Sequence, residues 1–264
     1  MRQQQNGFGG DESLCQDLVQ ALTCAEKIRH WMFTPQMMAE QSALGEVAAR
    51  LEKIVARDAV QSDHDQEQTR RQTLVDSARS IIRFHDLLLT ARGSDLQQYL
   101  INIMRAMRIL SQVQEELFAY HRELEPLDQY WREPETILPS SFEGPGGKSC
   151  LNPGLFHVGA EGERYPRGGF SVYVPETVFE AQPAPLLIAL HGGFGHGRDF
   201  IWNWMREARS RGCILLAPSS KKDTWSIMNP QDDLTTIQSA IRYIKERYPV
   251  DTGCMLVTGL SDGG

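Results

Sequence analysis

The serine in Gly259-Leu260-Ser261-Asp262-Gly263 is the residue of this sequence best suited to covalent chemistry. The pattern G-x-S-x-G directly follows the apolar, β-prone run 254–258. A sharp turn from a strand into a helix lifts such a serine above the edge of a sheet, and glycines flank it because a Cβ there would clash. The motif makes Ser261 a candidate nucleophile. The simpler alternative is an ordinary loop serine beside glycines.

A second motif of small residues lies upstream, at His191-Gly192-Gly193-Phe194-Gly195. The apolar run 185–190 leads into it and predicts a fully buried strand. Small residues at the end of such a strand let backbone N–H groups face a developing negative charge, as in an oxyanion hole. We expect the N–H groups of Gly193 and Asp262 to be the two donors, with Gly192 in the oxyanion loop.

Nucleophilic catalysis at Ser261 needs a histidine to take the hydroxyl proton and an acid to orient that histidine. His191 is one candidate for the base and His196 a weaker one, but we expect His191 to shape the oxyanion loop instead. Asp262 adjoins the serine and is a poor candidate for the acid. Because no acid and histidine follow Ser261, we expect the chain to be an inactive piece of a longer protein.

Two aromatic residues are candidate substrate contacts. Phe194 lies in the oxyanion loop, and Trp225 follows the strand expected at 213–217. Trp225 can equally be a structural residue. We expect no metal or other cofactor, because the seven histidines are scattered and the five cysteines contain no C-x-x-C pair. Cys213 and Cys254 are each expected to open a buried strand, as reduced thiols.

The pattern along the chain predicts an α/β protein in two parts. Residues 1–125 carry apolar residues at helical spacing and predict an antiparallel helical bundle that serves as an accessory domain. Residues 126–153 are rich in proline and glycine and predict a linker. Residues 154–264 predict the first portion of a second domain.

In that second domain, strands and helices alternate. A hairpin of 154–158 with 170–174 comes first, followed by strands near 186–190, 213–217 and 255–258 with helices near 200–211 and 234–247 between them. This alternation predicts right-handed crossovers and a mainly parallel sheet. His191, Pro218 and Ser261 then fall at the carboxyl ends of their strands, where sites in such sheets form.

Residues 154–264 resemble the α/β-hydrolase superfamily, and most of all its carboxylesterase, phospholipase and polyester-depolymerase-like branch. The resemblance is carried by Phe170–Pro175, Leu190–Gly193, Leu216–Pro218 and Gly259–Gly263. It implies a serine esterase or lipase-like hydrolase acting on a small-molecule carboxylic ester or thioester. In that superfamily the acid and the histidine follow the serine, so the resemblance implies a sheet that is truncated here.

Composition narrows the function classes. The chain has 264 residues, a hydrophobic fraction of 41% and a formal net charge of −7. An acidic chain argues against a nucleic-acid partner, and no apolar run reaches the length of a membrane span. The polar first residues carry no signal core, so we expect a cytoplasmic protein of unknown oligomeric state. The alternative function is a non-catalytic interaction protein with a degenerate hydrolase remnant.

Overall fold

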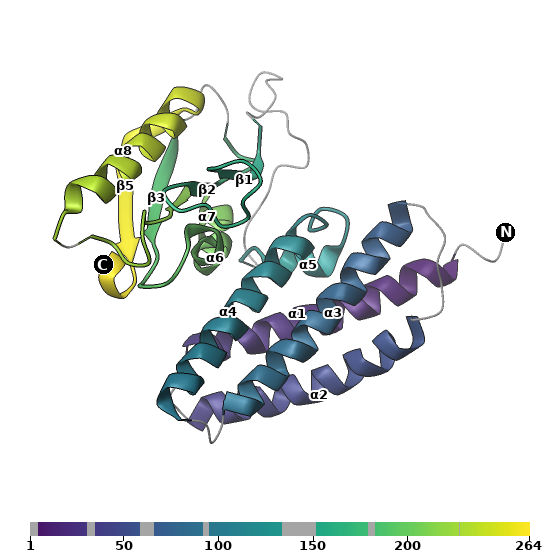
Figure 1. Ribbon diagram of the computed structural model, residues 1–264. Helices are drawn as coiled ribbons and strands as arrows, with labels where there is room; N and C mark the ends of the chain where they lie inside the picture. Colours follow the sequence, from purple (N-terminus) through teal and green to yellow (C-terminus); the bar gives the residue numbers. More distant parts are fainter. Residues whose placement is uncertain are drawn as a thin grey trace. The chain divides into compact units, whose positions relative to one another are not determined.

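A computed structural model describes residues 5–30, 35–58, 66–91, 95–133, 152–178, 183–226 and 228–264 (Figure 1). The chain divides into two compact units, Met1–Tyr130 and Trp131–Gly264. The first unit is helical and the second contains a mixed sheet with helices, so the chain is of the α/β class.

Consecutive long helices pack side by side in the first unit. They are α1 (Gln5–His30), α2 (Pro35–Asp58), α3 (Gln66–Ala91) and α4 (Leu96–Phe118), followed by the short α5 (Glu125–Tyr130). Asp95 caps α4 by accepting a hydrogen bond from the backbone N–H of Gln98. Helix α5 occupies the first residues of the segment predicted as a linker, and residues 134–151 of that segment lie outside the described residues.

The second unit is built on a five-stranded sheet with the order β1-β2-β4-β3-β5. Its strands are β1 (Gly154–Val158), β2 (Phe170–Val174), β3 (Ala184–Leu190), β4 (Ile214–Pro218) and β5 (Val250–Gly259), and its helices are α6 (Gly197–Phe200), η1 (Ile201–Asn203), α7 (Met205–Arg211), α8 (Pro230–Arg247) and η2 (Ser261–Gly263). The predicted hairpin strands therefore occur with the predicted bounds.

The direction in which the chain crosses the sheet reverses at β3. Strands β1, β2 and β4 are joined in antiparallel pairs, whereas β3 pairs in parallel with both β4 and β5. The chain leaves β3 toward β4 and later returns past β3 to reach β5. Loops at the carboxyl ends of these strands therefore diverge to either side of β3, and this is where open α/β sheets bind ligands.

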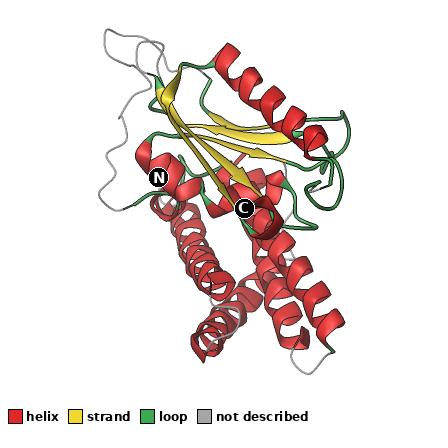
Figure 2. Cartoon of the chain, turned by 90° about the vertical axis from the view of Figure 1, so that its left-hand side faces the viewer, coloured by secondary structure: helices red, strands yellow, loops and turns green. Residues whose placement is uncertain are grey.

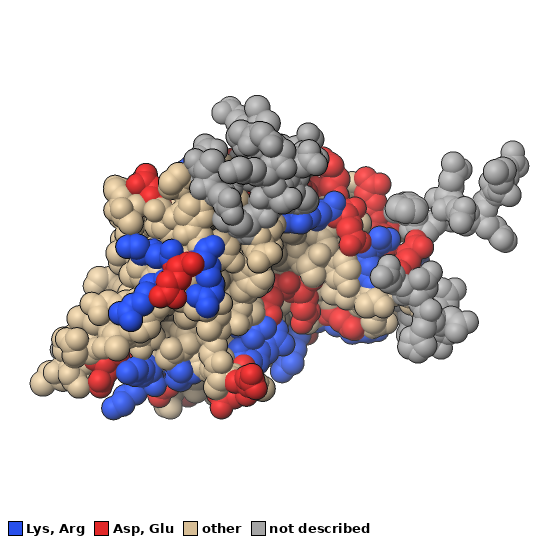
Figure 3. Space-filling view, turned by 90° about the horizontal axis from the view of Figure 1, so that it is seen from above, with Lys and Arg blue, Asp and Glu red and all other residues tan. Residues whose placement is uncertain are grey.

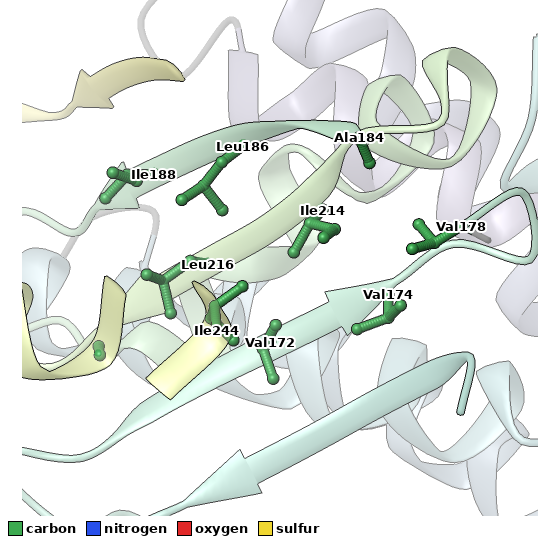
Figure 4. Close-up of a cluster of buried hydrophobic side chains, with 10 residues drawn as sticks. Val172, Val174, Val178, Ala184, Leu186, Ile188, Ile214, Leu216 and Ile244 are labelled. Carbon is green, nitrogen blue, oxygen red and sulfur yellow. The ribbon is translucent and has the colours of Figure 1, made fainter. Parts of the chain in front are cut away.

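Alternating side chains give the sheet two apolar faces. On one face Val172, Leu186, Ile188 and Leu216 pack with Ile244 of α8 in a buried cluster (Figure 4). The opposite face carries the register-matched residues Tyr173, Leu187 and Leu215, and helices α6 and α7 cover it (Figure 2). Burial on both faces explains why the parallel strands are nearly continuous apolar runs.

Strand β5 is less buried than its sequence predicts. Leu256 and Val257 are each 61% exposed, because β5 pairs only with β3 among the described residues. Cys254 lies inside β5 and is exposed, and Cys213 lies just before β4 and is half-buried. The expectation for Cys213 holds to within one residue, because β4 is buried throughout, whereas the expectation for Cys254 is wrong, because β5 begins at Val250 and is largely exposed. Both carry free thiols, as do the buried Cys15 and Cys24, whereas Cys150 lies outside the described residues.

Acidic and basic side chains are intermixed on the face shown in Figure 3. The helices that the structure describes include none that is both long and apolar enough to cross a membrane.

A matched pair of leucines tests where the core of the second unit lies. We expect Leu216→Ala, at a site with 0% exposure, to lower the free energy of unfolding by about 2–5 kcal/mol, since it removes buried methyl groups and leaves a cavity. Leu256→Ala, in the exposed strand β5, should change it by less than about 0.5 kcal/mol. Urea unfolding followed by circular dichroism measures both, and equal effects would contradict this placement of the core.

Candidate active site

Ser261 stands on a strained turn at the carboxyl end of β5. Its φ is +56°, in the left-handed region that residues other than glycine rarely adopt. The turn is held by hydrogen bonds from the N–H of Leu260 to Leu190 O, at 3.1 Å, and from the N–H of Gly263 to Leu260 O, at 3.0 Å. A strained backbone at this position is what a nucleophile elbow requires.

Both glycines of the G-x-S-x-G motif are dictated by close backbone contacts. A Cβ on Gly259 would collide with the carbonyl oxygen of Gly263. A Cβ on Gly263 would lie 2.5 Å from His191 O and 2.7 Å from Leu190 O. The elbow therefore folds back tightly onto itself and onto the end of β3, which leaves no room for larger residues.

The glycine-rich loop at residues 191–195 lies against the turn that carries Ser261. A Cβ placed on Gly192 would be 3.4 Å from the Cβ of Ser261, and one on Gly193 would be 3.5 Å from Oδ2 of Asp262. The two motifs, which are far apart in the sequence, therefore meet at adjacent strand ends. The loop itself is closed by a hydrogen bond of 2.9 Å from the N–H of Gly195 to Gly192 O.

Two backbone donors at this junction are left unused. Within the described residues, the N–H groups of Gly193 and Asp262 donate no hydrogen bond, whereas the N–H of Phe194 donates to Asp223 O at 2.6 Å. The hydroxyl of Ser261 likewise has no hydrogen-bond partner in the part of the chain that the structure describes. Free N–H groups beside a serine hydroxyl are what an oxyanion hole offers.

Both ring nitrogens of His191 are occupied. Its Nε2 accepts a hydrogen bond of 3.1 Å from the N–H of Ser220, so Nδ1 carries the proton and donates to Gly192 O at 2.7 Å. The ring is 1% exposed, and burial lowers the pKa of His191 below its usual value despite the bond to Gly192. This neutral imidazole joins the glycine-rich loop to Ser220 through both of its ring nitrogens, so neither nitrogen is available to Ser261.

His196 is also engaged on both ring nitrogens. Its Nδ1 accepts a hydrogen bond from the N–H of Arg198, and its Nε2 contacts Pro166 O and the hydroxyl of Ser219, each at 3.1 Å. The side chain is buried. Neither histidine near the oxyanion loop is therefore placed to take a proton from Ser261.

The two aromatic candidates differ in their surroundings. Phe194 is 58% exposed, has a φ of +61°, and donates its N–H to Asp223 O. Trp225 is 7% exposed, its indole N–H donates to His191 O at 2.6 Å, and its ring lies 4.9 Å from that of His191. These contacts favour the structural alternative for Trp225, whereas a substrate contact by Phe194 stays a prediction.

Asp262 joins the elbow to the loop after β4. Its Oδ2 accepts a hydrogen bond of 3.3 Å from the N–H of Trp225. Its Oδ1 is buried and has no partner among the described residues. The carboxylate of Asp262 is therefore directed toward the loop after β4, where it bonds the backbone of Trp225.

Three positioning residues carry no recognisable motif. The buried Asp233 of α8 accepts from the N–H groups of Lys221 and Ser226. Arg167 of the hairpin loop donates to Gly195 O at 2.9 Å and also to Ser220 and Asp223. With Ser220, they fix the loops on either side of the elbow. An acidic residue in a first helical turn and an arginine in a loop are too common to be singled out from the sequence.

The described residues contain no group of three or more His, Cys, Asp or Glu side chains placed to hold a metal ion.

Comparisons with known proteins give a partial structural likeness. No family model and no curated protein matches the sequence. An acetyl xylan esterase from Aspergillus awamori is 21% identical with a TM-score of 0.34, over 41% of this chain and 43% of that one. A CE1 ferulic acid esterase from Anaeromyces mucronatus, in complex with ferulic acid, is 17% identical with a TM-score of 0.29, over 48% and 55%. The chain thus spans about half the length of these esterase structures.

The lowered pKa of His191 predicts a pH dependence of stability. The unfolded chain binds a proton on this residue near pH 6.5, but the folded chain does so only at lower pH. Stability from this residue is thus complete above about pH 6.5 and is lost as the pH falls toward the folded pKa. We expect His191→Gln to flatten the decline in unfolding free energy between about pH 7 and pH 5. A His191→Gln slope equal to wild type would refute the assignment.

Proposed function

We propose that this chain contributes the nucleophile and the oxyanion hole of a serine esterase or lipase-like hydrolase of the α/β-hydrolase fold. Ser261 attacks the carbonyl carbon of a carboxylic ester or thioester, and the N–H groups of Gly193 and Asp262 stabilise the oxyanion that forms. The single observation that carries the proposal is the meeting of a strained serine turn with a glycine loop whose N–H group is free.

We further propose that the base and the acid come from residues outside this sequence. Both histidines nearest the elbow are bonded through both ring nitrogens. Without a base the serine keeps its proton, and only the residual catalysis of the oxyanion hole and of binding remains. The sheet of the second unit is then the first portion of a larger sheet, in which strand β5 gains a neighbour.

The helical unit fits an accessory role in this proposal. Residues 1–125 would form an antiparallel bundle, and 126–153 would link it to the hydrolase portion. The bundle has a core of its own that includes Leu18, Leu51, Leu74 and Phe84, each with 0% exposure.

One observation favours the alternative of a non-catalytic interaction protein. In the described part of the chain, no histidine beside Ser261 is available to take its proton.

Covalent labelling of the serine separates the two functions. In the natural-length protein we expect a fluorophosphonate probe to modify Ser261, because a complete triad activates that hydroxyl. Ser261→Ala should abolish labelling, and Ser226→Ala, in the loop after β4, should preserve it.

Residues 1–264 by themselves should hydrolyse p-nitrophenyl acetate no faster than their Ser261→Ala variant, since losing a triad member costs several orders of magnitude in rate. Labelling that survives Ser261→Ala would place the nucleophile elsewhere. Ser261-dependent turnover by residues 1–264 would show that a histidine within this sequence is the base.

A further inference from the structure

Three basic side chains lie in the loops beside the proposed oxyanion hole, and we name Arg167, Lys221 and Lys222 the basic cluster. Arg167 belongs to the loop between β1 and β2, and the two lysines follow β4. A Cβ on Gly168 would lie 3.5 Å from Cγ of Lys221, so the stem of this lysine passes close to the residue after Arg167. The hydroxyl of Ser220 accepts from Arg167 Nη1 at 3.3 Å and donates to Lys222 O at 2.6 Å. The three residues are therefore neighbours in the fold.

The basic cluster borders the glycine-rich loop directly. Arg167 Nη1 donates to Gly195 O at 2.9 Å. The methyl group of Thr224 would lie 3.5 Å from a Cβ on Gly193, whose N–H is a proposed oxyanion donor. Lys222 comes two residues before Thr224, so their Cα atoms are at most about 7.6 Å apart. The positive charges thus lie beside the place where the proposed function puts the carbonyl group of an ester.

Positive charge exceeds negative charge in this group of side chains. Lys221 and Lys222 are exposed, and in the described part of the chain neither ammonium group has an ion-pair or hydrogen-bond partner. Asp223 is the exposed carboxylate next to them, and its Oδ1 is bonded to Arg167 Nη2 at 3.2 Å. Three positive charges and one negative charge leave a net charge of +2.

Two further carboxylates face these loops from neighbouring elements, but both are turned inward. Asp233 of α8 is 5% exposed and accepts hydrogen bonds from the backbone N–H groups of Lys221 and Ser226. Asp262 Oδ2 accepts from the N–H of Trp225, and its Oδ1 is buried. Neither carboxylate is placed to bind a ligand that approaches from solvent.

The pKa of His191 shows that the charge of Arg167 is felt at the end of β3. Burial does most to lower the pKa of His191. Among the nearby charges Arg167 also lowers that pKa, and its effect exceeds the opposite effect of Asp262 and that of Asp233. Arg167 is thus close enough for its positive charge to act on the loop that holds the proposed oxyanion donor.

An anionic group is the ligand that fits this arrangement. Two of the five N–H groups of the Arg167 guanidinium are left unbonded by the described residues, and each lysine ammonium offers three. A cation would be repelled, and an uncharged group would gain less from these donors than an anion does. The cationic end of a zwitterion would find only Asp223, which Arg167 already binds.

We propose that the basic cluster binds a carboxylate or phosphate group of a small molecule. In a step that rests on the proposed function, this group is part of the ester or thioester that Ser261 attacks, and the hydrolase prefers anionic substrates. Charges at the mouth of a site also raise the rate at which ligands of opposite charge arrive. Binding of the anion itself requires no catalysis.

Titration of isotope-labelled residues 1–264 tests anion binding directly. We expect one or both of two anions, methyl phosphate and monomethyl succinate, to shift the backbone amide signals of Gly195 and of residues 221–223. The two probes distinguish a phosphate from a carboxylate. Uncharged methyl butyrate should shift none of these signals, and added salt should weaken the binding of either anion, because salt screens exposed charges.

A pair of double variants separates the basic cluster from the net charge of the chain. Lys221→Gln/Lys222→Gln should weaken anion binding about fivefold, a modest loss because exposed charge pairs are individually weak. Arg242→Gln/Lys245→Gln removes the same charge from exposed positions of α8 and should leave the binding unchanged.

Kinetics of the natural-length protein test the preference for anionic substrates. Lys221→Gln/Lys222→Gln should lower kcat/KM for p-nitrophenyl hydrogen adipate about fivefold, mainly through KM, since the lysines bind a remote part of the substrate. The same variant should keep kcat/KM for p-nitrophenyl hexanoate, which has the same chain length and no charge. Equal losses with both esters would contradict recognition of the charge.

Three binding results would overturn the proposal: no amide shift with either anion, equal anion binding by wild type and Lys221→Gln/Lys222→Gln, or the same shifts with methyl butyrate. The binding site and the hydrolase are judged separately. Anion binding in a protein whose Ser261 fails to label supports the basic cluster and rejects the hydrolase. Labelling of Ser261 in a protein that binds neither anion does the opposite.

Discussion

The close approach of the end of β3 to the elbow is the contact on which the second unit depends. Gly263 sits against the carbonyl oxygens of Leu190 and His191, where a Cβ would lie within 2.7 Å of either one. That contact brings Gly192 beside Ser261 and leaves the N–H of Gly193 unbonded nearby. This contact requires β3 and β5 to be parallel neighbours, so the position of the loop at residues 191–195 depends on the order of the strands.

Buried polar residues hold the loops around that contact. The N–H of Ser220 donates a hydrogen bond to His191 Nε2, and the indole N–H of Trp225 donates to His191 O. Asp233 of α8 accepts hydrogen bonds from the N–H groups of Lys221 and Ser226 in the same loop. Hydrogen bonds of this kind are individually modest, but a buried donor or acceptor that loses its partner is costly. These bonds hold the loops in place around the end of β3, and in the proposed function donors that are already in position would stabilise an oxyanion.

The elements of the sheet could be predicted from the sequence because apolar runs and turn residues carry a local signal. The hairpin strands and the runs into His191 and Gly259 are examples. The roles of Arg167 and Asp233 depend on contacts between distant segments, which leave no local pattern. The exposure of Leu256 and Val257 in β5 likewise depends on which other strands pair with β5, and the residues of β5 themselves carry no signal of this.

Proximity of the oxyanion loop and the elbow can be measured without any enzymatic activity. Cβ atoms at positions 192 and 261 would be 3.4 Å apart, close to the separation that a disulfide bond spans. In a chain carrying Gly192→Cys and Ser261→Cys, mild oxidation should join the two peptides, as identified by mass spectrometry after proteolysis. A Phe194→Cys and Ser261→Cys chain is the matched control and should cross-link more slowly. Failure of the 192–261 pair to cross-link in a folded chain would contradict the close approach of Gly192 to Ser261 on which the proposed active site depends.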